Sequence, residues 1–175
     1  MPEITRDHLA EVLEEIALLL ELKGENTFKI RAYRNGSEIV QSFDGDIVQR
    51  ARENDLKGIK GIGEALQQKL HELASSGLLA FHQNLRNEFP EGLFELLELQ
   101  GLGPRKVRAL YEELSVASLG GLKRACQSGQ ELSRIFTASP GFATNHWRVI
   151  KFSPNFSGYS GLTANDITKP LISPS

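Results

Sequence analysis

The sequence predicts an all-α fold made of two small helical subdomains followed by an irregular C-terminal tail. Apolar residues recur three and four positions apart through most of the chain, which is the period of an amphipathic helix. The N-terminal half contains no alternation of apolar and polar residues of the kind that marks a half-buried strand. Glycine, proline and asparagine separate the helical segments by short loops, so neighbouring helices are expected to pack against each other.

The first predicted helix covers residues 5–23. Its apolar stripe consists of Leu9, Val12, Leu13, Ile16, Leu19 and Leu20. Thr5 is a suitable N-cap, and Gly24 can end the helix in a left-handed conformation. A second helix is expected from Thr27 to Val40. Its inward residues are predicted to be Phe28, Ala32, Tyr33 and either Ile39 or Val40, with Lys29, Arg31 and Arg34 facing outward.

Asp46 is expected to cap a third, short helix that contains Ile47, Val48 and Ala51. Further helices are predicted near 64–76, 79–88, 91–98, 104–114, 118–127 and 129–135. These segments divide the chain into a first helical domain at 1–78, a second subdomain at 79–134 and a tail at 135–175.

The tail differs from the rest of the chain in composition. Of the 20 lysines and arginines and 22 aspartates and glutamates, only Arg148, Lys151, Asp166 and Lys169 lie beyond residue 134. Four of the seven prolines also fall there, and no helical period is visible. A segment with so few charges, many prolines and no periodicity is expected to be loosely ordered.

Overall composition excludes several classes of protein. A net charge of -2 is incompatible with a binder that relies on a generally basic surface, so any contact with nucleic acid must be local. Cys126 is the single cysteine, which excludes an internal disulfide and fits a reducing compartment. No apolar run is long enough to span a membrane, and we therefore expect a cytoplasmic, nucleoid-associated protein without membrane contact.

A repeated motif carries the functional prediction. Residues 56–70 and 96–110 share an apolar framework around Gly61-Ile62-Gly63 and Gly101-Leu102-Gly103, forty residues apart, and each is followed by a predicted helix. Glycines permit a tight turn that exposes backbone amides at the start of that helix, where the helix dipole also favours an anion. Nearby cations are Lys60, Arg105, Lys106 and Arg108. One such turn is often a plain connection between helices, whereas two matched copies favour binding of the DNA backbone.

These motifs, together with residues 20–34 and their Arg-Ala-Tyr-Arg ending, resemble bacterial and archaeal family X DNA polymerases, which are relatives of DNA polymerase beta. The resemblance runs from about residue 5 to residue 134. It implies a lyase-type domain with a first helix-hairpin-helix motif, followed by a fingers-like subdomain with a second. The palm domain of the family has no counterpart here, so the resemblance implies a truncated protein without polymerase activity.

The resemblance also implies particular site residues. Lys69 occupies the position of a lysine that forms a Schiff base with an abasic deoxyribose, a step that requires an unprotonated amine. Lys29, Tyr33 and Arg34 correspond to the phosphate pocket, whereas Ala65 replaces the second lysine of that pocket. The hairpins of the family often bind Na⁺ or K⁺ through backbone carbonyls. Here these would be the carbonyls of Lys57, Ile59 and Ile62, and those of Leu97, Leu99 and Leu102.

The expected function is sequence-independent binding of gapped, nicked or end-containing DNA during DNA repair, specifically base excision repair. No cofactor is required, although a monovalent cation is expected at the hairpins. Two alternatives stay open. In the first, the chain is a 5′-deoxyribose phosphate lyase that uses Lys69; in the second, it is a truncated remnant that binds other repair proteins.

Overall fold

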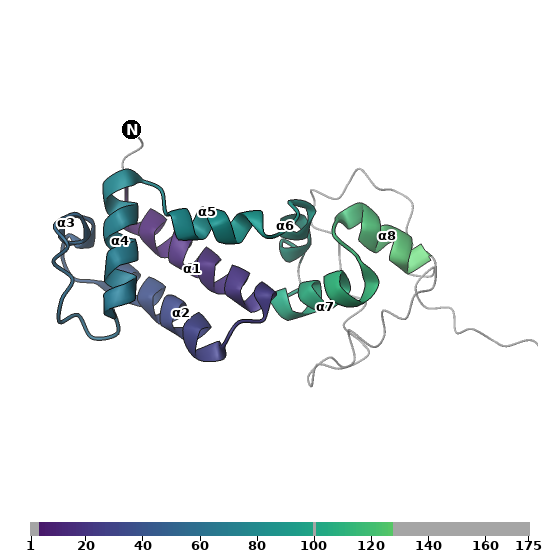
Figure 1. Ribbon diagram of the computed structural model, residues 1–175, viewed down its shortest axis with the longest axis horizontal. Coiled ribbons are helices and arrows are strands. Elements are labelled where there is room, and N and C mark those ends of the chain that lie inside the picture. Colours follow the sequence, from purple (N-terminus) through teal and green to yellow (C-terminus); the bar gives the residue numbers. More distant parts are fainter. Residues whose placement is uncertain (1–3, 100, 128–175) are drawn as a thin grey trace, which may run out of the picture. The chain divides into compact units, whose positions relative to one another are not determined.

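The computed structural model describes residues 4–99 and 101–127, and within them the chain forms eight α-helices and no β-strand (Figure 1). The predicted all-α fold is therefore confirmed for this part of the chain. Two compact units are present, Met1–Pro90 and Glu91–Ser175. The helix predicted at 129–135 and the tail predicted at 135–175 lie outside the described residues.

The first unit is built around its longest helix. Its five helices are α1 (Arg6–Lys23), α2 (Thr27–Ser42), α3 (Ile47–Arg52), α4 (Glu64–Ser76) and α5 (Ala80–Asn87). Helices α2 and α5 lie on either side of α1, and α3 and α4 also contact it (Figure 1). Leu9, Leu13 and Ile16 of α1 are 0% exposed. Because complete burial of such a side chain contributes roughly 1.5–3 kcal/mol, α1 anchors the hydrophobic core.

Side-chain caps set the starts of three of these helices. Thr5 Oγ1 accepts a hydrogen bond from the His8 amide at 3.2 Å, and Gly24 ends α1 in the left-handed conformation, as the sequence predicted. Asn26 caps α2 through the Phe28 amide at 2.8 Å, and Asp46 caps α3 through the Gln49 amide at 2.9 Å. Each cap satisfies an amide that has no partner inside its own helix.

Helix α2 turns a different stripe inward from the one predicted. Tyr33 and Val40 are buried, but Phe28 is 75% exposed and Ala32 is also exposed, so their predicted inward placement is wrong. The buried stripe instead includes Gly36 and Ser37, and Ser37 Oγ donates to the Ala10 carbonyl of α1 at 2.8 Å. Gly36 leaves room for Leu66 of α4 and for Leu13 of α1, and with the bond from Ser37 this fixes the rotation of α2 and leaves Phe28 outside.

Helix α5 belongs to the first unit, which therefore extends past the boundary at residue 78 that the sequence suggested. It packs against α1, and its Leu85 is 3% exposed. Ion pairs add to this contact: Arg86 of α5 pairs with Glu15 of α1, and Glu88 after α5 lies 2.6 Å from Lys23 Nζ.

The second unit contains α6 (Gly92–Leu97), α7 (Pro104–Leu114) and α8 (Leu119–Gln127). The side chains of Leu93, Leu96, Val107 and Leu110 are 0% exposed and form its core. Helix α6 contacts both α7 and α8. In neither unit do the described residues include a helix that is long and apolar enough to cross a membrane.

Candidate nucleic-acid interface

Both glycine motifs form the turns that the sequence predicted, and each turn leads directly into a helix. The first glycine of each motif has a positive φ, +94° at Gly61 and +89° at Gly101. Residues with a β-carbon rarely adopt this conformation, so glycine is required for steric reasons at these two positions. A side chain at Gly61 would in addition collide with Ile39.

The second glycine of each motif has a different basis. Gly63 and Gly103 have φ values of -77° and -80°, which any L-residue adopts, so the steric argument made from the sequence does not apply to them. A β-carbon built on either residue would meet no heavy atom within 4 Å among the described residues. Neither a positive φ nor close packing therefore requires glycine at these two positions, although glycine is a favoured N-cap residue. Their lack of a side chain instead leaves the approach to the first turn of α4 and of α7 open.

The helices that follow the turns begin without a side-chain cap. Gly63 and Gly103 are the N-caps of α4 and α7, and neither has a side chain that could accept from the first-turn amides. This contrasts with α1, α2 and α3, whose first turns are capped by Thr5, Asn26 and Asp46. The starts of α4 and α7 thus combine N–H groups without intrahelical acceptors and the positive end of a helix dipole, an arrangement that favours a bound anion.

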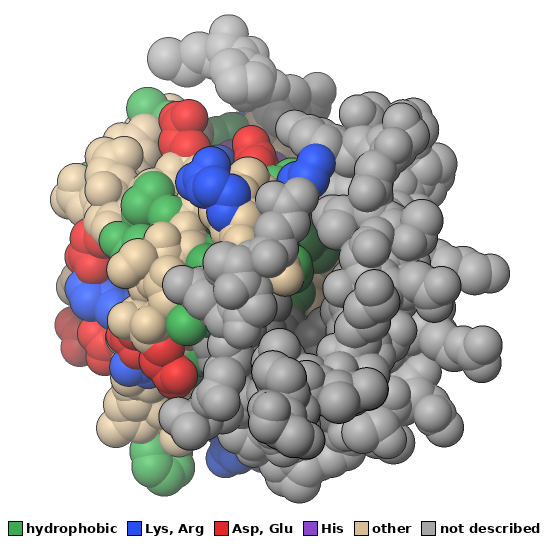
Figure 2. Space-filling view, turned by 90° about the vertical axis from the view of Figure 1, so that its right-hand side faces the viewer, with side chains coloured by type: hydrophobic (Ala, Val, Ile, Leu, Met, Phe, Trp, Pro, Cys, Tyr) green, Lys and Arg blue, Asp and Glu red, His purple; other side chains and the backbone are tan. Residues whose placement is uncertain are grey.

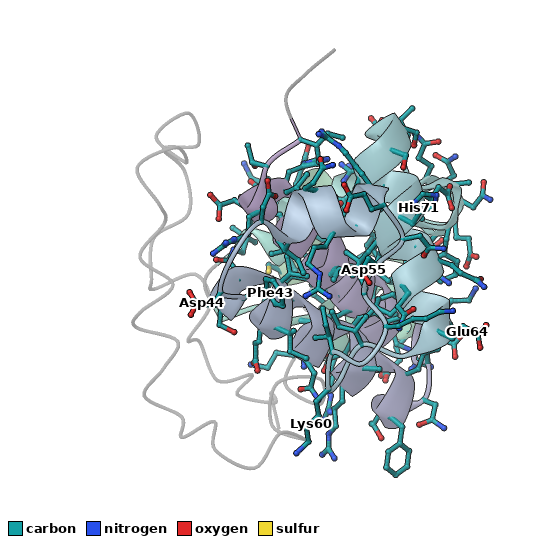
Figure 3. The ribbon with its side chains drawn as sticks, turned by 90° about the vertical axis from the view of Figure 1, so that its left-hand side faces the viewer. Phe43, Asp44, Asp55, Lys60, Glu64 and His71 are labelled. Carbon is teal, nitrogen blue, oxygen red and sulfur yellow. The ribbon has the colours of Figure 1, made fainter. Side chains whose placement is uncertain are left out.

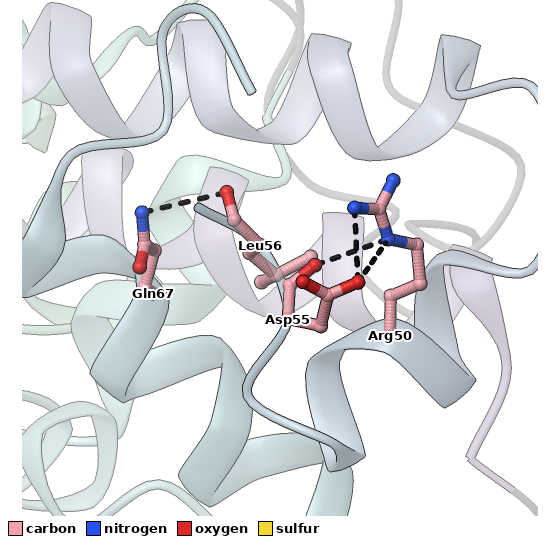
Figure 4. Close-up of polar contacts among 4 residues, drawn as sticks. All are labelled: Arg50, Asp55, Leu56 and Gln67. Carbon is pink, nitrogen blue, oxygen red and sulfur yellow. Dashed lines mark hydrogen bonds and ion pairs between the residues drawn. The ribbon is translucent and has the colours of Figure 1, made fainter. Parts of the chain in front are cut away.

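Several contacts hold the first hairpin in place. Before the turn, Arg50 Nε donates to the Asp55 carbonyl at 3.0 Å, and its Nη2 lies 3.1 Å from the Asp55 carboxylate (Figure 4). On α4, the side chains of Gln67 and His71 reach back to carbonyls of residues that precede that helix; His71 Nδ1 lies 2.9 Å from the Ala51 oxygen. The turn is consequently fixed to α3 on one side and to α4 on the other.

The predicted cations near the hairpins differ in their surroundings. Lys60 is exposed and projects outward from the first hairpin (Figure 3), and Arg105 is exposed at the start of α7. Lys106 Nζ donates to the Gly101 carbonyl at 3.0 Å, so it contacts its own hairpin. Arg108 Nε lies 2.9 Å from Glu112 on the next turn of α7, which partly neutralises it.

Acidic groups also lie near the cations. Glu64, the first residue of α4, is exposed beside the open amides of the first hairpin (Figure 3). On the face shown in Figure 2, basic and acidic side chains are interspersed over the described residues. This arrangement agrees with the net charge of -2.

A second group of predicted site residues surrounds an aromatic ring that the sequence did not single out. Phe81 of α5 is stacked against Tyr33, with ring centroids 6.1 Å apart. Lys69 Nζ lies 5.0 Å and Lys29 Nζ 5.9 Å from the centroid of the same ring. The fold thus brings the predicted Schiff-base lysine to two residues of the predicted phosphate pocket. Burial raises the pKa of Tyr33 above its ordinary value, so its hydroxyl stays a proton donor at neutral pH.

Two other residues of the predicted pocket add less to it. Arg34 pairs with carboxylates of α1, at 2.6 Å from Glu21 and 3.5 Å from Glu14. The hydrogen bond to Glu21 raises the pKa of Arg34, and these ion pairs compete with any phosphate. Ala65 is exposed on the first turn of α4 and supplies no charge.

Comparisons with known proteins agree with this geometry. Residues 4–79 match a family model described as a helix-hairpin-helix domain. The chain is 35% identical over 119 residues to the DNA polymerase/3′-5′ exonuclease PolX of Bacillus subtilis (strain 168). The match covers 68% of this chain and 20% of that protein, so the chain spans about a fifth of its relative.

The two glycine turns between helices, together with the matched family model, define a helix-hairpin-helix protein. Within that class the chain belongs with the N-terminal region of the family X DNA polymerases, and the resemblance predicted from the sequence is confirmed.

Two contributors to the site were missed from the sequence. Phe81 lies outside both repeats, and no local pattern connects it to Lys69. Gln67, in contrast, could have been found by aligning the repeats, because its counterpart forty residues later is Val107. A polar residue opposite an apolar one at matched positions indicates a different role in each hairpin.

Proposed function

We propose that this chain binds the sugar-phosphate backbone of DNA at gaps, nicks or ends, independently of base sequence, and that it acts in the cytoplasm at the nucleoid. The observation that carries this proposal is the pair of open turns. Gly63 and Gly103 need neither a positive φ nor close packing, and both lie over first-turn amides that have no side-chain cap. A phosphate oxygen that accepts from those amides gives a reason for both features.

Contacts of this kind position the protein on DNA without reading bases, because phosphates carry no sequence information. If each hairpin neutralises about one or two phosphates, the logarithm of affinity falls with the logarithm of salt with a slope of about -2 to -4. That slope is shallow, as expected of a chain whose net charge is -2. Binding should accordingly be weak at high salt and detectable at low salt.

Fluorescence anisotropy with a labelled duplex that carries a one-nucleotide gap tests the proposal directly. We expect tighter binding to the gapped duplex than to an intact duplex of the same sequence, and equal binding to gapped duplexes of different sequence. Equal affinity for gapped and intact duplexes would contradict the preference for gaps. No binding at low salt would reject the proposal and favour the alternative, in which the chain binds another repair protein.

The grouping of Lys69, Lys29 and Tyr33 around Phe81 supports a second candidate function, 5′-deoxyribose phosphate lyase activity. In this reaction the neutral amine of Lys69 attacks the C1′ aldehyde of an abasic sugar and loses water to form a Schiff base. β-Elimination then removes a C2′ proton and breaks the C3′–O bond, so the DNA strand leaves with a 5′ phosphate, and water hydrolyses the remaining Schiff base to free Lys69 and the sugar phosphate. Lys69 Nζ lies over the face of Phe81, 5.0 Å from the ring centroid, so the ring helps to position the amine.

Borohydride trapping on gapped DNA with a 5′-deoxyribose phosphate tests the lyase proposal. We expect a covalent adduct that Lys69→Ala abolishes. Lys23→Ala is the matched control, since Lys23 pairs with Glu88 and lies in neither hairpin. An adduct that persists in Lys69→Ala would assign the chemistry to another amine, and its absence from the unchanged chain would leave only DNA binding.

The monovalent cation implied by the resemblance fits the second hairpin better than the first. The carbonyls of Leu97, Leu99 and Leu102 are the oxygen donors that would hold it, and a hard cation there would attract a phosphate oxygen. In the first hairpin, two of the three corresponding carbonyls already accept hydrogen bonds, one of them from a side chain.

A further inference from the structure

Two of the three carbonyl groups that the resemblance assigns to a cation in the first hairpin, those of Ile59 and Ile62, accept hydrogen bonds from within the chain. The Ile59 oxygen accepts from the Ile62 amide at 3.1 Å. Gln67 Nε2 then reaches two further carbonyls, that of Ile62 at 3.3 Å and that of Leu56 at 3.4 Å (Figure 4 draws the contact with Leu56). Gln67 therefore joins the residue before the turn to the middle residue of the turn.

The chemistry of the carboxamide matches this position. Its nitrogen carries two hydrogens, so one group can serve two carbonyl oxygens. Rotating the group to bring the amide oxygen to the same place would set three oxygens against each other, so the nitrogen must face the carbonyls. Both distances exceed the usual N–H···O range of about 2.7–3.2 Å, so each bond is weak, as happens when a single nitrogen spans two acceptors.

The second hairpin has no equivalent of this side chain. The residue forty positions after Gln67 is Val107, which is 0% exposed and has no donor. The Leu99 oxygen accepts from the Leu102 amide at 3.0 Å, which repeats the backbone contact of the first hairpin. Among the described residues, however, no side chain donates to the Leu102 carbonyl, the counterpart of Ile62. Lys106 Nζ donates to a different carbonyl, that of Gly101.

We propose that the Gln67 carboxamide closes the first hairpin in place of a monovalent cation, so that only the second hairpin responds to Na⁺ or K⁺. Gln67 is a positioning residue: it holds the carbonyls of the turn through hydrogen bonds, and the amides at the start of α4 stay directed outward. The contact depends on one side chain of this chain and does not require DNA to be bound.

Amide signals of the full chain in ¹H–¹⁵N NMR spectra test the proposal without DNA. Tetramethylammonium chloride is replaced by potassium chloride at constant ionic strength, because tetramethylammonium is too large to be coordinated by a turn. We expect a saturable shift of the Gly101 and Gly103 signals, with the Gly61 and Gly63 signals unchanged. A saturable shift at Gly61 and Gly63 in the unchanged chain would overturn the proposal.

Variants at position 67 make the test specific. Gln67→Val copies the second hairpin and should give the Gly61 signal a saturable response to potassium. Gln67→Glu keeps the shape of the side chain but replaces the donor by a carboxylate, so it should also make the Gly61 signal respond to potassium. This variant keeps the test available if Gln67→Val does not fold. Gln67→Asn keeps the amide on a shorter side chain. We expect its Gly61 signal to respond to potassium less than in Gln67→Val and more than in the unchanged chain.

The reciprocal variant Val107→Gln is expected to reduce the response of Gly101. If neither Gln67→Val nor Gln67→Glu gains a potassium response, the side chain does not stand in for a cation and the proposal fails. Because no DNA is present in these samples, their outcome is independent of the proposed function, which the anisotropy experiment tests separately.

Discussion

Replacing both Gly63 and Gly103 by alanine separates folding from binding, because these two glycines are open to solvent on the side where a β-carbon would lie. Their φ values near -80° suit alanine, and an added methyl group meets nothing within 4 Å among the described residues. Gly61→Val and Gly101→Val would be less informative, because both positions have a positive φ and a change there strains the turn.

The expected magnitudes follow from two opposing effects on stability. Alanine in place of glycine lowers the entropy of the unfolded chain and stabilises by about 0.4–1 kcal/mol, while its poorer N-cap preference costs a similar amount. The net change in the free energy of unfolding should be within about 0.5 kcal/mol. On DNA, the methyl group displaces a phosphate from the first-turn amides. Loss of one hydrogen bond to a charged group costs about 1.5 kcal/mol, or about tenfold in affinity per hairpin.

Thermal unfolding and anisotropy on gapped DNA measure the two effects in the same preparations. We expect the double variant to bind about a hundredfold more weakly, since the two changes lie in different units and should be additive. Gly120→Ala in α8 is the matched control and should bind normally. Unchanged affinity of a folded double variant would refute the role of the hairpin amides, and a large fall in Tm would refute our account of the open space.

Three further changes test other features of the structure. Glu64→Gln removes a carboxylate beside the first hairpin and should tighten DNA binding by about fivefold at low salt, an effect of ~1 kcal/mol that added salt should abolish. Gly92→Ala would drive a methyl group into backbone of the loop before α8 and should lower the free energy of unfolding of the second unit by roughly 1–3 kcal/mol in a denaturant titration, while Gly120→Ala should not. Burial raises the pKa of Tyr33 above its ordinary value of 10.0, so the stability that this residue contributes is complete below pH 10.0 and is lost as the pH rises through the folded-state pKa. The free energy of unfolding should therefore fall less steeply above pH 10.0 in Tyr33→Phe than in the unchanged chain. If Tyr33→Phe and the control Tyr111→Phe show the same slope of this free energy against pH, the prediction is wrong.

Local signals in the sequence were sufficient for most of the helices. The ends of α1 follow from the cap at Thr5 and from Gly24, and α7 begins at Pro104 and ends at Leu114 as predicted. Such ends depend on hydrogen bonds and backbone angles within a few residues, which composition and spacing express directly. The orientation of α2 cannot be predicted in this way, because it depends on which of its residues allow close contact with the neighbouring helices. Phe28 was therefore placed inside although it is exposed.

The candidate site likewise has features that depend on nearby residues and features that depend on helix packing. By itself, the sequence determined the all-α class, the two glycine turns and the relationship to the family X DNA polymerases, because each depends on residues that are close together in the chain. Only the tertiary structure placed Phe81 against Tyr33 and Lys69, and only it showed that Gln67 reaches the carbonyls of Leu56 and Ile62. These contacts join different helices and turns, and their geometry is set by how the helices pack. A sequence pattern within one segment therefore cannot predict this geometry.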